Sequence, residues 1–494
     1  MTAIIIAGKP FESLKSIITK RGGTQLPPRP ISTNHFESRD ASTQRNVPKA
    51  FKLEAMSSTA TTQIVRPART LRGSLTLPGD KSISHRYAML AGIAAGTTHL
   101  SNFSTGADPH SSLACMKALG ATVVHNPDKT IAITGTAGSF IQPAAPLDCG
   151  NSGSTMRMLA GLIAPHPHTF TLIGDHSLTL RPMERIRKPL TQMGARIDLV
   201  DGHAPITIHG GPLRAIDFDT PIPSAQVKTA VLFAGFQANG TTSLTESVRT
   251  RDHSEHALRA FGATLNREAA EAGGITKLSV PGHQTLKAID ATVPGDLSSA
   301  AFFLCAALLF PDCNLVLDSI GMNPTRASLL DVITALGGKI KVLNVEEHHG
   351  ELVGTIQVNG PASGPRGMHI GGALSAQIID ELPVLAAIAP YTINGITIRD
   401  AKELRVKESD RIALVAQNLR AMGAELTEHE DGLEVPGNQR LHGATIDSGS
   451  DHRIAMAFSI AALRATGDTE ICGAEAAAIS FPEFFTHLDA LCQR

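Results

Sequence analysis

The chain has 494 residues, of which 42% are hydrophobic, and its formal net charge at pH 7 is −1. This length and apolar content can form one large core or two medium ones, so two compact lobes are expected. The near-neutral charge argues against bulk binding to nucleic acid or to an anionic membrane surface. The six cysteines have neither metal-ligand nor CxxC spacing, which indicates reduced thiols in a cytosolic protein. The longest apolar run, 300–310, is far shorter than the roughly 20 residues that span a bilayer, and it predicts a buried helix.

Residues 1–61 differ in composition from the rest of the chain. They are rich in Ser, Thr, Pro, Arg and Lys without a sustained hydrophobic period, so a poorly ordered N-terminal extension is expected. A transit peptide would fit the basic residues but not the acidic Glu12, Glu37 and Asp40. The alternative is that translation begins at Met56.

From about residue 62 the sequence repeats itself. A strand-like segment that ends on glycine occurs six times, at intervals of roughly 55 to 80 residues. These glycines are Gly79, Gly135, Gly210, Gly282, Gly360 and Gly437. Between them, helical segments end on a further glycine, as helix C-termini often do, and a short strand precedes each of those helices. Six units of strands and helices are therefore expected to pack three and three into two lobes.

Two similar sequences, PGDKSISHR at Pro78 and PGDLSSAAF at Pro294, indicate where the chain crosses between the lobes. The first lobe is then discontinuous, with residues 62–78 and 295–494, and the second comprises residues 79–294. A small anionic ligand would bind in the cleft between them, where helix N-termini from both lobes meet.

The segment 78–86 carries a distinct chemical pattern. Asp80 opens a helix whose first turns hold Lys81, Ser82 and Arg86. Cations, hydroxyls and unpaired backbone N–H groups at a helix N-terminus favour a phosphate or a carboxylate. The alternative is an ordinary Asp cap with a solvated basic face.

Five further segments place a cation beside a small-residue turn or a helix start: 150–157, 181–188, 224–228, 403–411 and 451–453. Each has a structural alternative, such as a tight turn, a Ser cap or a solvated, self-paired face. In 403–411, Lys407 and Arg411 are four residues apart and would share a helix face. Asp380 precedes an apolar helix, where burial can shift a carboxylate pKa for general-base catalysis; a partner for the helix dipole is the alternative. The joint occurrence of these segments at helix starts favours one anion-binding site.

The motifs resemble, in order and spacing, the signatures of the 5-enolpyruvylshikimate-3-phosphate synthase family, which has 3-phosphoshikimate 1-carboxyvinyltransferase activity. They are PGDKSISHR, GNSGSTMR, RPMER, SAQVKTA, TRDHSEH, PGDLSSAA, DELPVLA, RVKESDR and DHRIAM, and the resemblance covers residues from about 64 to 494. It implies an α/β, two-lobed enolpyruvyl transferase fold of six βαβαββ units packed three and three.

The resemblance also implies the reaction. The enolpyruvyl group of phosphoenolpyruvate would pass to the 5-hydroxyl of shikimate 3-phosphate, with release of phosphate, in chorismate and aromatic amino acid biosynthesis. No cofactor and no metal would take part, and neither nucleic acid nor a membrane would be a partner. The family further implies a cytoplasmic monomer and makes the protein a glyphosate target.

Residue roles carry over from the matched motifs. Lys81, Asp380 and Glu408 would be catalytic, with Asp380 taking the proton of the 5-hydroxyl and Glu408 passing one to the methylene carbon. The shikimate 3-phosphate site would comprise Lys81, Ser82, Arg86, Ser224, Ala225, Gln226, Asp380 and Lys407. The phosphoenolpyruvate site would comprise Lys81, Gly153, Arg181, Gln226, Arg411, His452 and Arg453, with Arg157 as an anchor near the Gly-rich turn. Glyphosate would occupy the phosphoenolpyruvate site.

The chain departs from one branch of the family at three positions. Ser480 stands for a Lys, Glu403 for an Asn, and Arg251 lies where that branch has a Tyr-containing segment. The TRDH and SAQVK segments resemble a second branch that is often less sensitive to glyphosate, whereas Gly153 leaves room for the inhibitor.

Two other functions are alternatives. One is the sibling transferase that acts on UDP-N-acetylglucosamine, but its usual mobile-loop Cys has no counterpart between Gly174 and Arg187. The other is a non-catalytic anion-binding relative. The presence of Asp380 and Glu408 argues against it, because carboxylates in a pocket weaken pure anion binding.

Overall fold

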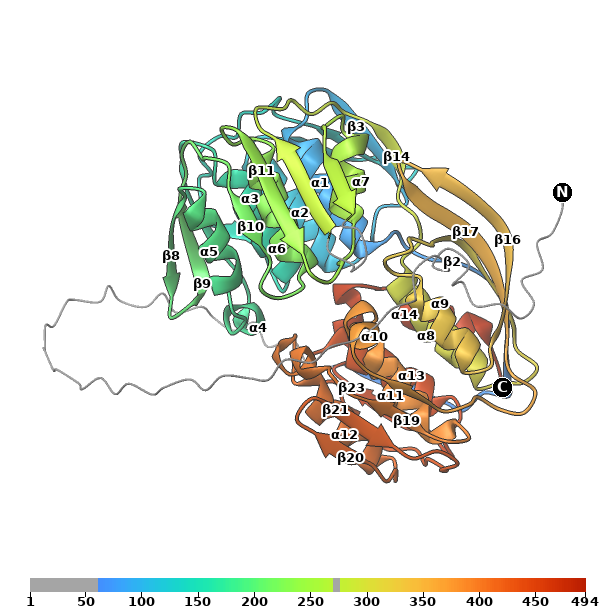
Figure 1. Cartoon of the computed structure of the whole chain (residues 1–494). Helices are drawn as coiled ribbons and strands as arrows, with labels where there is room; N and C mark the ends of the chain where they lie inside the picture. Colours follow the sequence, from blue (N-terminus) through green and yellow to red (C-terminus); the bar gives the residue numbers. More distant parts are fainter. Residues whose placement is uncertain (1–60, 270–275) are drawn as a thin grey trace, which may run out of the picture.

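The computed structural model describes residues 61–269 and 276–494, which form two α/β lobes (Figure 1). The extension expected over residues 1–61 lies outside the described residues except for Thr61, whose backbone N–H and hydroxyl both donate to Glu475. The six predicted repeats correspond to six small sheets, so the predicted fold class is confirmed.

Four sheets share one pairing pattern, which is the structural form of the repeat. Their strand orders are β14-β3-β5-β4, β6-β7-β9-β8, β10-β11-β13-β12 and β18-β19-β21-β20. In each, the first pair is parallel and the other two pairs are antiparallel. The strands are β3 (Thr97–Ser101), β4 (Thr122–His125), β5 (Ile131–Thr134), β6 (Leu147–Asp148), β7 (Thr169–Ile173), β8 (Arg196–Val200), β9 (His203–His209), β10 (Asp217–Asp219), β11 (Thr241–Glu246), β12 (Asn266–Ala269), β13 (Thr276–Pro281), β14 (Asp290–Thr292), β18 (Met368–Ile370), β19 (Ile396–Ile398), β20 (Thr427–His429) and β21 (Gly432–Val435).

The other two sheets join the two ends of the described chain. One has the order β16-β17-β15-β2-β24 and the other β1-β23-β22. Their strands are β1 (Thr62–Val65), β2 (Thr70–Thr76), β15 (Asn314–Gly321), β16 (Lys339–His348), β17 (Glu351–Asn359), β22 (Thr445–Asp447), β23 (Thr469–Cys472) and β24 (Cys492–Gln493). Strands β1 and β2 thus pair with strands of the C-terminal half, β23 and β15 respectively.

Six helices are packed inside the lobes. They are α1 (Lys81–Ile93), α3 (Gly153–Ile163) and α6 (Ala225–Gly235) in one lobe, and α8 (Leu297–Leu308), α11 (Leu382–Ile388) and α13 (His452–Ala462) in the other. The apolar run 300–310 falls largely on α8, which is buried at every position, as predicted. No helix in the part of the chain that the structure describes is both long and apolar enough to cross a membrane.

The remaining helices lie around these six. They are α2 (Ala107–Ala118), α4 (His176–Thr179), α5 (Glu184–Gln192), α7 (His253–Ala260), α9 (Ser328–Ala335), α10 (Ala373–Gln377), α12 (Arg411–Ala421) and α14 (Phe484–Leu491), with short 3-10 helices η2 (Ala389–Tyr391), η3 (Lys402–Val406) and η4 (Ala474–Ile479).

Buried apolar side chains form two clusters, one per lobe. One cluster draws on residues 83–293 and the other on residues 65–77 and 297–491. We propose the limits derived from the PGD sequences, 62–78 with 295–494 and 79–294, as the domain boundaries. The two crossing segments touch, because Asp80 N–H donates to the Pro294 carbonyl at 2.7 Å and Asp296 N–H to the Pro78 carbonyl at 3.0 Å.

A close helix contact gives a test of the packing beneath the helix starts. A Cβ added at Gly161 in α3 would lie 2.0 Å from the Ala230 carbonyl oxygen in α6. Gly161→Ala should therefore lower the free energy of unfolding by about 1 to 3 kcal/mol, although Ala is the better helix former. Gly211→Ala is the control, since a methyl group there meets no atom within 4 Å. Equal thermal midpoints for the two variants would contradict this packing.

Candidate active site

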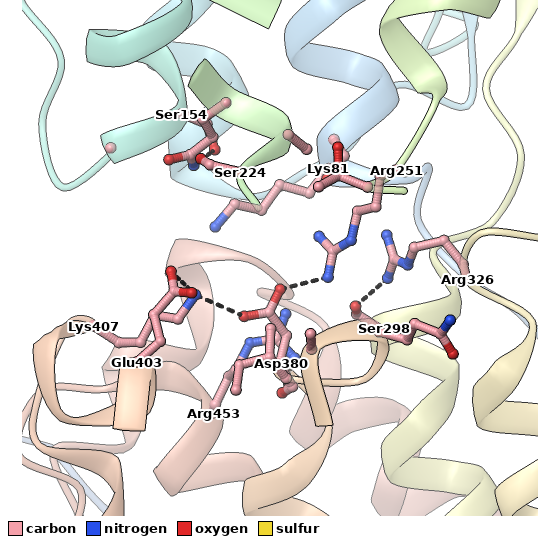
Figure 2. A pocket seen from close by; sticks show the side chains of 18 of the residues that line it. Lys81, Ser154, Ser224, Arg251, Ser298, Arg326, Asp380, Glu403, Lys407 and Arg453 are labelled. Atoms are coloured by element: carbon pink, nitrogen blue, oxygen red, sulfur yellow. Dashed lines mark hydrogen bonds and ion pairs between the residues drawn. The ribbon is translucent and has the colours of Figure 1, made fainter. Parts of the chain in front are cut away.

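Helix starts from both lobes meet at a cleft of about 260 Å³ (Figure 2). Eleven Lys or Arg side chains line it, against six Asp or Glu. This excess of positive charge, enclosed between two lobes, favours anionic ligands.

The structure brings together every residue that the sequence analysis assigned to a site. All of them line the cleft: Lys81, Ser82, Arg86, Gly153, Arg157, Arg181, Ser224, Ala225, Gln226, Asp380, Lys407, Glu408, Arg411, His452 and Arg453. Glu403 and Ser480, two of the departures, line it as well. Shared location does not test the role of each residue, and the roles remain predictions.

The helix starts at the cleft are capped by their own side chains. The capping residues are Asp80, Ser152, Ser224, Asp296, Asp410 and Asp451. The cap interpretation of these motifs is therefore right, and it does not compete with the anion site, because the cation beside each cap can still face the cleft. The solvated-face interpretation of 403–411 is wrong for Arg411, which is buried.

Asp380 lies among cations from both lobes (Figure 2). Arg251 Nη2 is 2.6 Å from Asp380 Oδ2, while Lys407 Nζ and Arg411 Nη1 lie 3.7 and 3.6 Å from Oδ1. Lys407 precedes α12, so the two residues do not share a helix face as predicted, yet both reach the same carboxylate. Burial alone would raise the pKa of Asp380, but Lys407, Arg453, Arg251 and Arg411 hold it well below its usual range. The carboxylate is therefore ionised at neutral pH.

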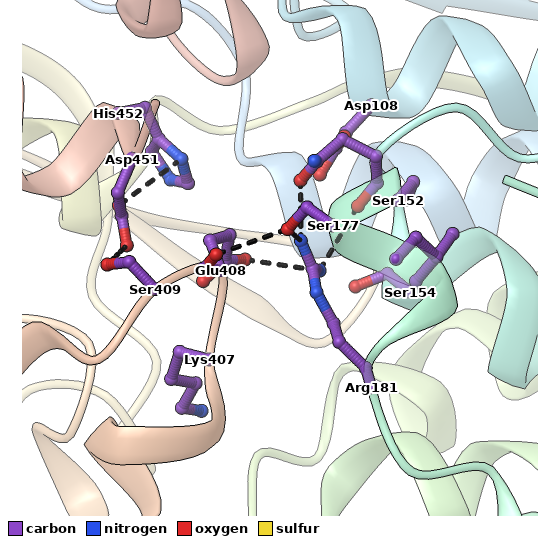
Figure 3. A network of polar contacts seen from close by, with 12 residues as sticks. Asp108, Ser152, Ser154, Ser177, Arg181, Lys407, Glu408, Ser409, Asp451 and His452 are labelled. Carbon is purple, nitrogen blue, oxygen red and sulfur yellow. Dashed lines mark hydrogen bonds and ion pairs between the residues drawn. The ribbon is translucent and has the colours of Figure 1, made fainter. Parts of the chain in front are cut away.

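Glu408 occupies a similar environment across the cleft from α4 (Figure 3). Its carboxylate pairs with Arg411, and its Oε1 lies 3.5 Å from Arg181 Nη1 in the other lobe. Burial would raise the pKa of Glu408, but Arg411, Arg181 and further cationic neighbours hold it well below its usual range. The Ser177 hydroxyl also donates to the Glu408 carbonyl at 3.1 Å, so the two lobes touch at this point.

Buried polar atoms without a hydrogen-bond partner in the described part of the chain lie beside these carboxylates. Arg411 Nη1 and both ring nitrogens of His452 are buried without a hydrogen-bond partner among the described residues. Burial, followed by repulsion from Lys81, lowers the pKa of His452 to about 3, so its ring is neutral at neutral pH. The Arg411 guanidinium and the single N–H of the neutral His452 ring can donate to ligand oxygens, whereas the other ring nitrogen is an acceptor.

The Gly-rich turn supplies a second polar cluster. Arg157 donates to Gln226 Oε1 at 2.7 Å, and Gln226 Nε2 donates to the Ser154 hydroxyl at 2.9 Å. Arg181 donates to the Asn151 side-chain oxygen at 2.7 Å. Starts of α3 and α6 are thereby tied to the loop that carries Arg181.

Arg86 forms hydrogen bonds with the protein itself. Its guanidinium donates to the hydroxyls of Ser254 and Thr229 at 2.7 and 2.8 Å and to the Ser82 carbonyl at 2.8 Å. Because each of its three nitrogens has a protein partner, Arg86 can shape the cleft floor as well as add charge to it.

The sequence analysis missed several cleft residues. Arg251 was noted only as a departure, and Arg185 and Asp108 were not assigned at all, although all three line the cleft. Asp108 contacts Lys81 Nζ, and its pKa is raised, mainly because it is buried. A signal was present, since Asp108 follows the small residue Gly106 by two positions, and Gly106 is the N-cap of α2.

Within residues 61–269 and 276–494, no group of three or more His, Cys, Asp or Glu is placed to hold a metal ion.

Comparison with known proteins gives one family. The sequence model of EPSP synthase (3-phosphoshikimate 1-carboxyvinyltransferase) matches residues 65–488. The 3-phosphoshikimate 1-carboxyvinyltransferase of Koribacter versatilis (strain Ellin345) is 58% identical over 430 residues, covering 87% of this chain and 99% of that protein. The enzyme of the same name from Solibacter usitatus (strain Ellin6076) is 50% identical over 430 residues, with the same coverage. An Acinetobacter baumannii EPSP synthase structure superposes with a TM-score of 0.76 at 38% identity, covering 88% of this chain and 98% of that one.

Inorganic phosphate tests the anion site. Bound phosphate should raise the thermal midpoint, and at 100 times its Kd it would add about 2.7 kcal/mol to the free energy of unfolding. Arg181→Gln should lose most of this shift, since Arg181 lines the cleft. Arg187→Gln should keep it, because Arg187 pairs with Glu184 and does not line the cleft. Thermal denaturation in phosphate, against chloride of the same ionic strength, checks this; equal shifts would place the anion elsewhere.

Proposed function

The chain belongs to the EPSP synthase (3-phosphoshikimate 1-carboxyvinyltransferase) family, and from that membership we propose the roles of its cleft residues. The activity transfers the enolpyruvyl group of phosphoenolpyruvate to shikimate 3-phosphate in the shikimate pathway, and these two compounds are the substrates that it implies. The observation that carries the assignment is that two partly buried carboxylates, Asp380 and Glu408, lie among cations from both lobes.

The charge of the substrates explains the charge of the cleft. Both carry a phosphate and a carboxylate, so they repel each other in water and need fixed cations to come within bonding distance. The ion pairs Arg251–Asp380 and Arg181–Glu408 cross the cleft and would hold the lobes together around the ligands. Exclusion of water would then strengthen each charge contact and protect the intermediate.

We assign the acceptor to the side of the cleft that holds Asp380. Shikimate 3-phosphate would be bound by Lys81, Ser82, Arg86, Ser224, Ala225, Gln226, Asp380 and Lys407, and we add Arg251 because its guanidinium meets Asp380. In the ligand-free protein, four cations make Asp380 a weak base. Substrate anions would share those cations, so the pKa of Asp380 would rise and the carboxylate would become able to take the 5-hydroxyl proton.

We assign the donor to the side that holds Glu408. Phosphoenolpyruvate would be bound by Lys81, Gly153, Arg181, Gln226, Arg411, His452 and Arg453. Glu408 is ionised in the free protein, because Arg411 and Arg181 outweigh its burial. Donor oxygens at these two guanidinium groups would offset their charge and raise the Glu408 pKa, which would allow it to deliver a proton to the methylene carbon.

The proposed steps balance. The 5-hydroxyl oxygen bonds to C2 of phosphoenolpyruvate, Asp380 takes the hydroxyl proton, and the methylene carbon receives a proton from Glu408. The tetrahedral intermediate then loses phosphate from C2, which takes the proton held by Asp380, and the former methylene carbon returns a proton to Glu408, which restores the double bond. Lys81 lines the cleft together with Asp380 and Glu408, and its ammonium would stabilise negative charge that develops on the substrates.

We also propose that the protein works as a cytoplasmic monomer. The reduced-thiol pattern of its cysteines supports the compartment, and the completeness of the cleft within one chain supports the oligomeric state, because both lobes that line it come from the same molecule. Sedimentation at micromolar concentration would test the second point.

A phosphate-release assay tests the function and the role of Asp380 together. The protein should release phosphate with shikimate 3-phosphate and phosphoenolpyruvate, and not with UDP-N-acetylglucosamine as the acceptor. Asp380→Asn should lower kcat by about 10² or more, because it removes general-base help, while an isosteric amide keeps an acceptor for Arg251. Calorimetry should find both substrates still bound.

The control is Asp217→Asn, a change at an exposed carboxylate that does not line the cleft. It should leave kcat and both KM values unchanged. Turnover by Asp380→Asn near that of the wild type would remove Asp380 from the mechanism, and turnover with UDP-N-acetylglucosamine would replace the proposed acceptor.

Gly153 should control discrimination between donor and glyphosate. A Cβ there would lie 2.9 Å from Arg157 Nη1 and 3.4 Å from Arg181 Nη1, so a methyl group would push into the donor side of the cleft. We expect glyphosate to compete with phosphoenolpyruvate, and Gly153→Ala to raise its inhibition constant by about 10- to 100-fold with a smaller rise in the donor's KM. Inhibition kinetics on both proteins check this. If both constants rise together, Gly153 is not the discriminating contact.

A further inference from the structure

Lys228 is a fully buried cation that does not line the cleft. It lies in the first turn of α6, after Gln226, and its Nζ is 3.0 Å from Glu246 Oε2 and 2.9 Å from Glu255 Oε1. The same nitrogen donates to the Thr250 carbonyl at 3.4 Å. A buried ammonium is tolerated only when its charge is paired and its donors are used, and here all three contacts are present.

These contacts hold the loop that follows β11 and carries Thr250 and Arg251. Glu246 ends β11, and its Oε1 accepts the Thr250 backbone N–H at 3.3 Å and the Thr250 hydroxyl. Thr250 is thus hydrogen-bonded to Lys228 or Glu246 through its backbone N–H, its carbonyl and its hydroxyl. The next residue is Arg251, whose side chain lies in the cleft against Asp380 (Figure 2). A fixed Thr250 therefore fixes the point from which Arg251 reaches into the cleft.

Buried charges lie below this loop. The carboxylates of Glu246 and Glu255 both pair with Lys228, and all three side chains are buried. Glu255 also acts electrostatically on the buried Arg86, and Arg86 donates to Ser254 beside it. Removal of the Lys228 charge would leave Glu246 and Glu255 without the cation that they share, and an unpaired buried charge is unfavourable.

We propose that Lys228, together with Glu246, is a positioning residue that sets the place of Arg251 and so the affinity for shikimate 3-phosphate, without itself touching a substrate. The proposal rests on the proposed function, in which Arg251 binds on the acceptor side. A residue that only stabilised the fold would change the thermal midpoint but would not act through Arg251.

A double-mutant cycle between Lys228→Met and Arg251→Gln separates the two roles. Lys228→Met should raise the calorimetric Kd and the KM for shikimate 3-phosphate by about tenfold, which is the loss expected for one charge-assisted hydrogen bond. The Kd and KM for phosphoenolpyruvate should change less. Arg251→Gln should do the same. The double variant should bind no more weakly than Arg251→Gln alone, because Lys228 acts through Arg251. Additive losses, or a folded Lys228→Met protein with wild-type Kd, would overturn the proposal.

Two further variants keep the test decisive. Leu232→Ala opens a cavity at a fully buried position of the same helix and should lower the thermal midpoint without changing Kd. If Lys228→Met does not fold, Glu246→Gln replaces it. This change keeps the side-chain size but removes the charge that pairs with Lys228, so it should also raise the Kd for shikimate 3-phosphate. An unchanged Kd would refute the proposal. Failure of the wild-type protein to bind shikimate 3-phosphate would instead refute the proposed function.

Discussion

The structure depends on an electrostatic constraint: eleven cations must share one small cleft when no substrate is present. Such a set repels itself, and the fold holds it by placing carboxylates among the cations. Asp380 and Glu408 are the clearest cases, since burial would neutralise each one and the surrounding guanidinium and ammonium groups keep it ionised. The same two carboxylates therefore serve as counter-ions in the free protein and, in the proposed mechanism, as proton carriers once substrate anions share those cations.

The repeat architecture explains how so much charge reaches one place. Each lobe packs three buried helices with their N-termini directed to the cleft, and a helix N-terminus already favours anions. Caps such as Asp80 and Asp296 satisfy the first backbone N–H groups, and the crossing segments that carry them hydrogen-bond to each other between the lobes. One segment can therefore both cap a helix and place a cation at the cleft, so the cap interpretation and the anion-site interpretation are compatible.

A second layer of buried charge lies beneath the first. Arg86 uses its three nitrogens on Ser82, Thr229 and Ser254, and Lys228 lies in the same layer with two glutamates. Both side chains are buried, and a buried charge is costly unless it is paired and hydrogen-bonded. Because these groups lie under the cleft floor, the positions of the residues that would contact the substrates depend on the packing of the lobe.

The sequence alone indicated the six-unit fold, the buried helix α8 and many of the cleft residues, because glycine-ended repeats and cation-bearing helix starts are local patterns; it did not assign Arg185 or Asp108 to the cleft. It also led to the family through motifs of high specificity. Only the tertiary structure decided which charges meet. Arg251 and Asp380 are 129 positions apart, and no local pattern indicates that their side chains lie 2.6 Å from each other. Likewise, Lys407 was expected on a helix with Arg411, but the chain bends before α12 and brings both to Asp380 from different directions. Ion pairs of this kind depend on how two lobes come together, which is a long-range property that spacing along the chain does not encode.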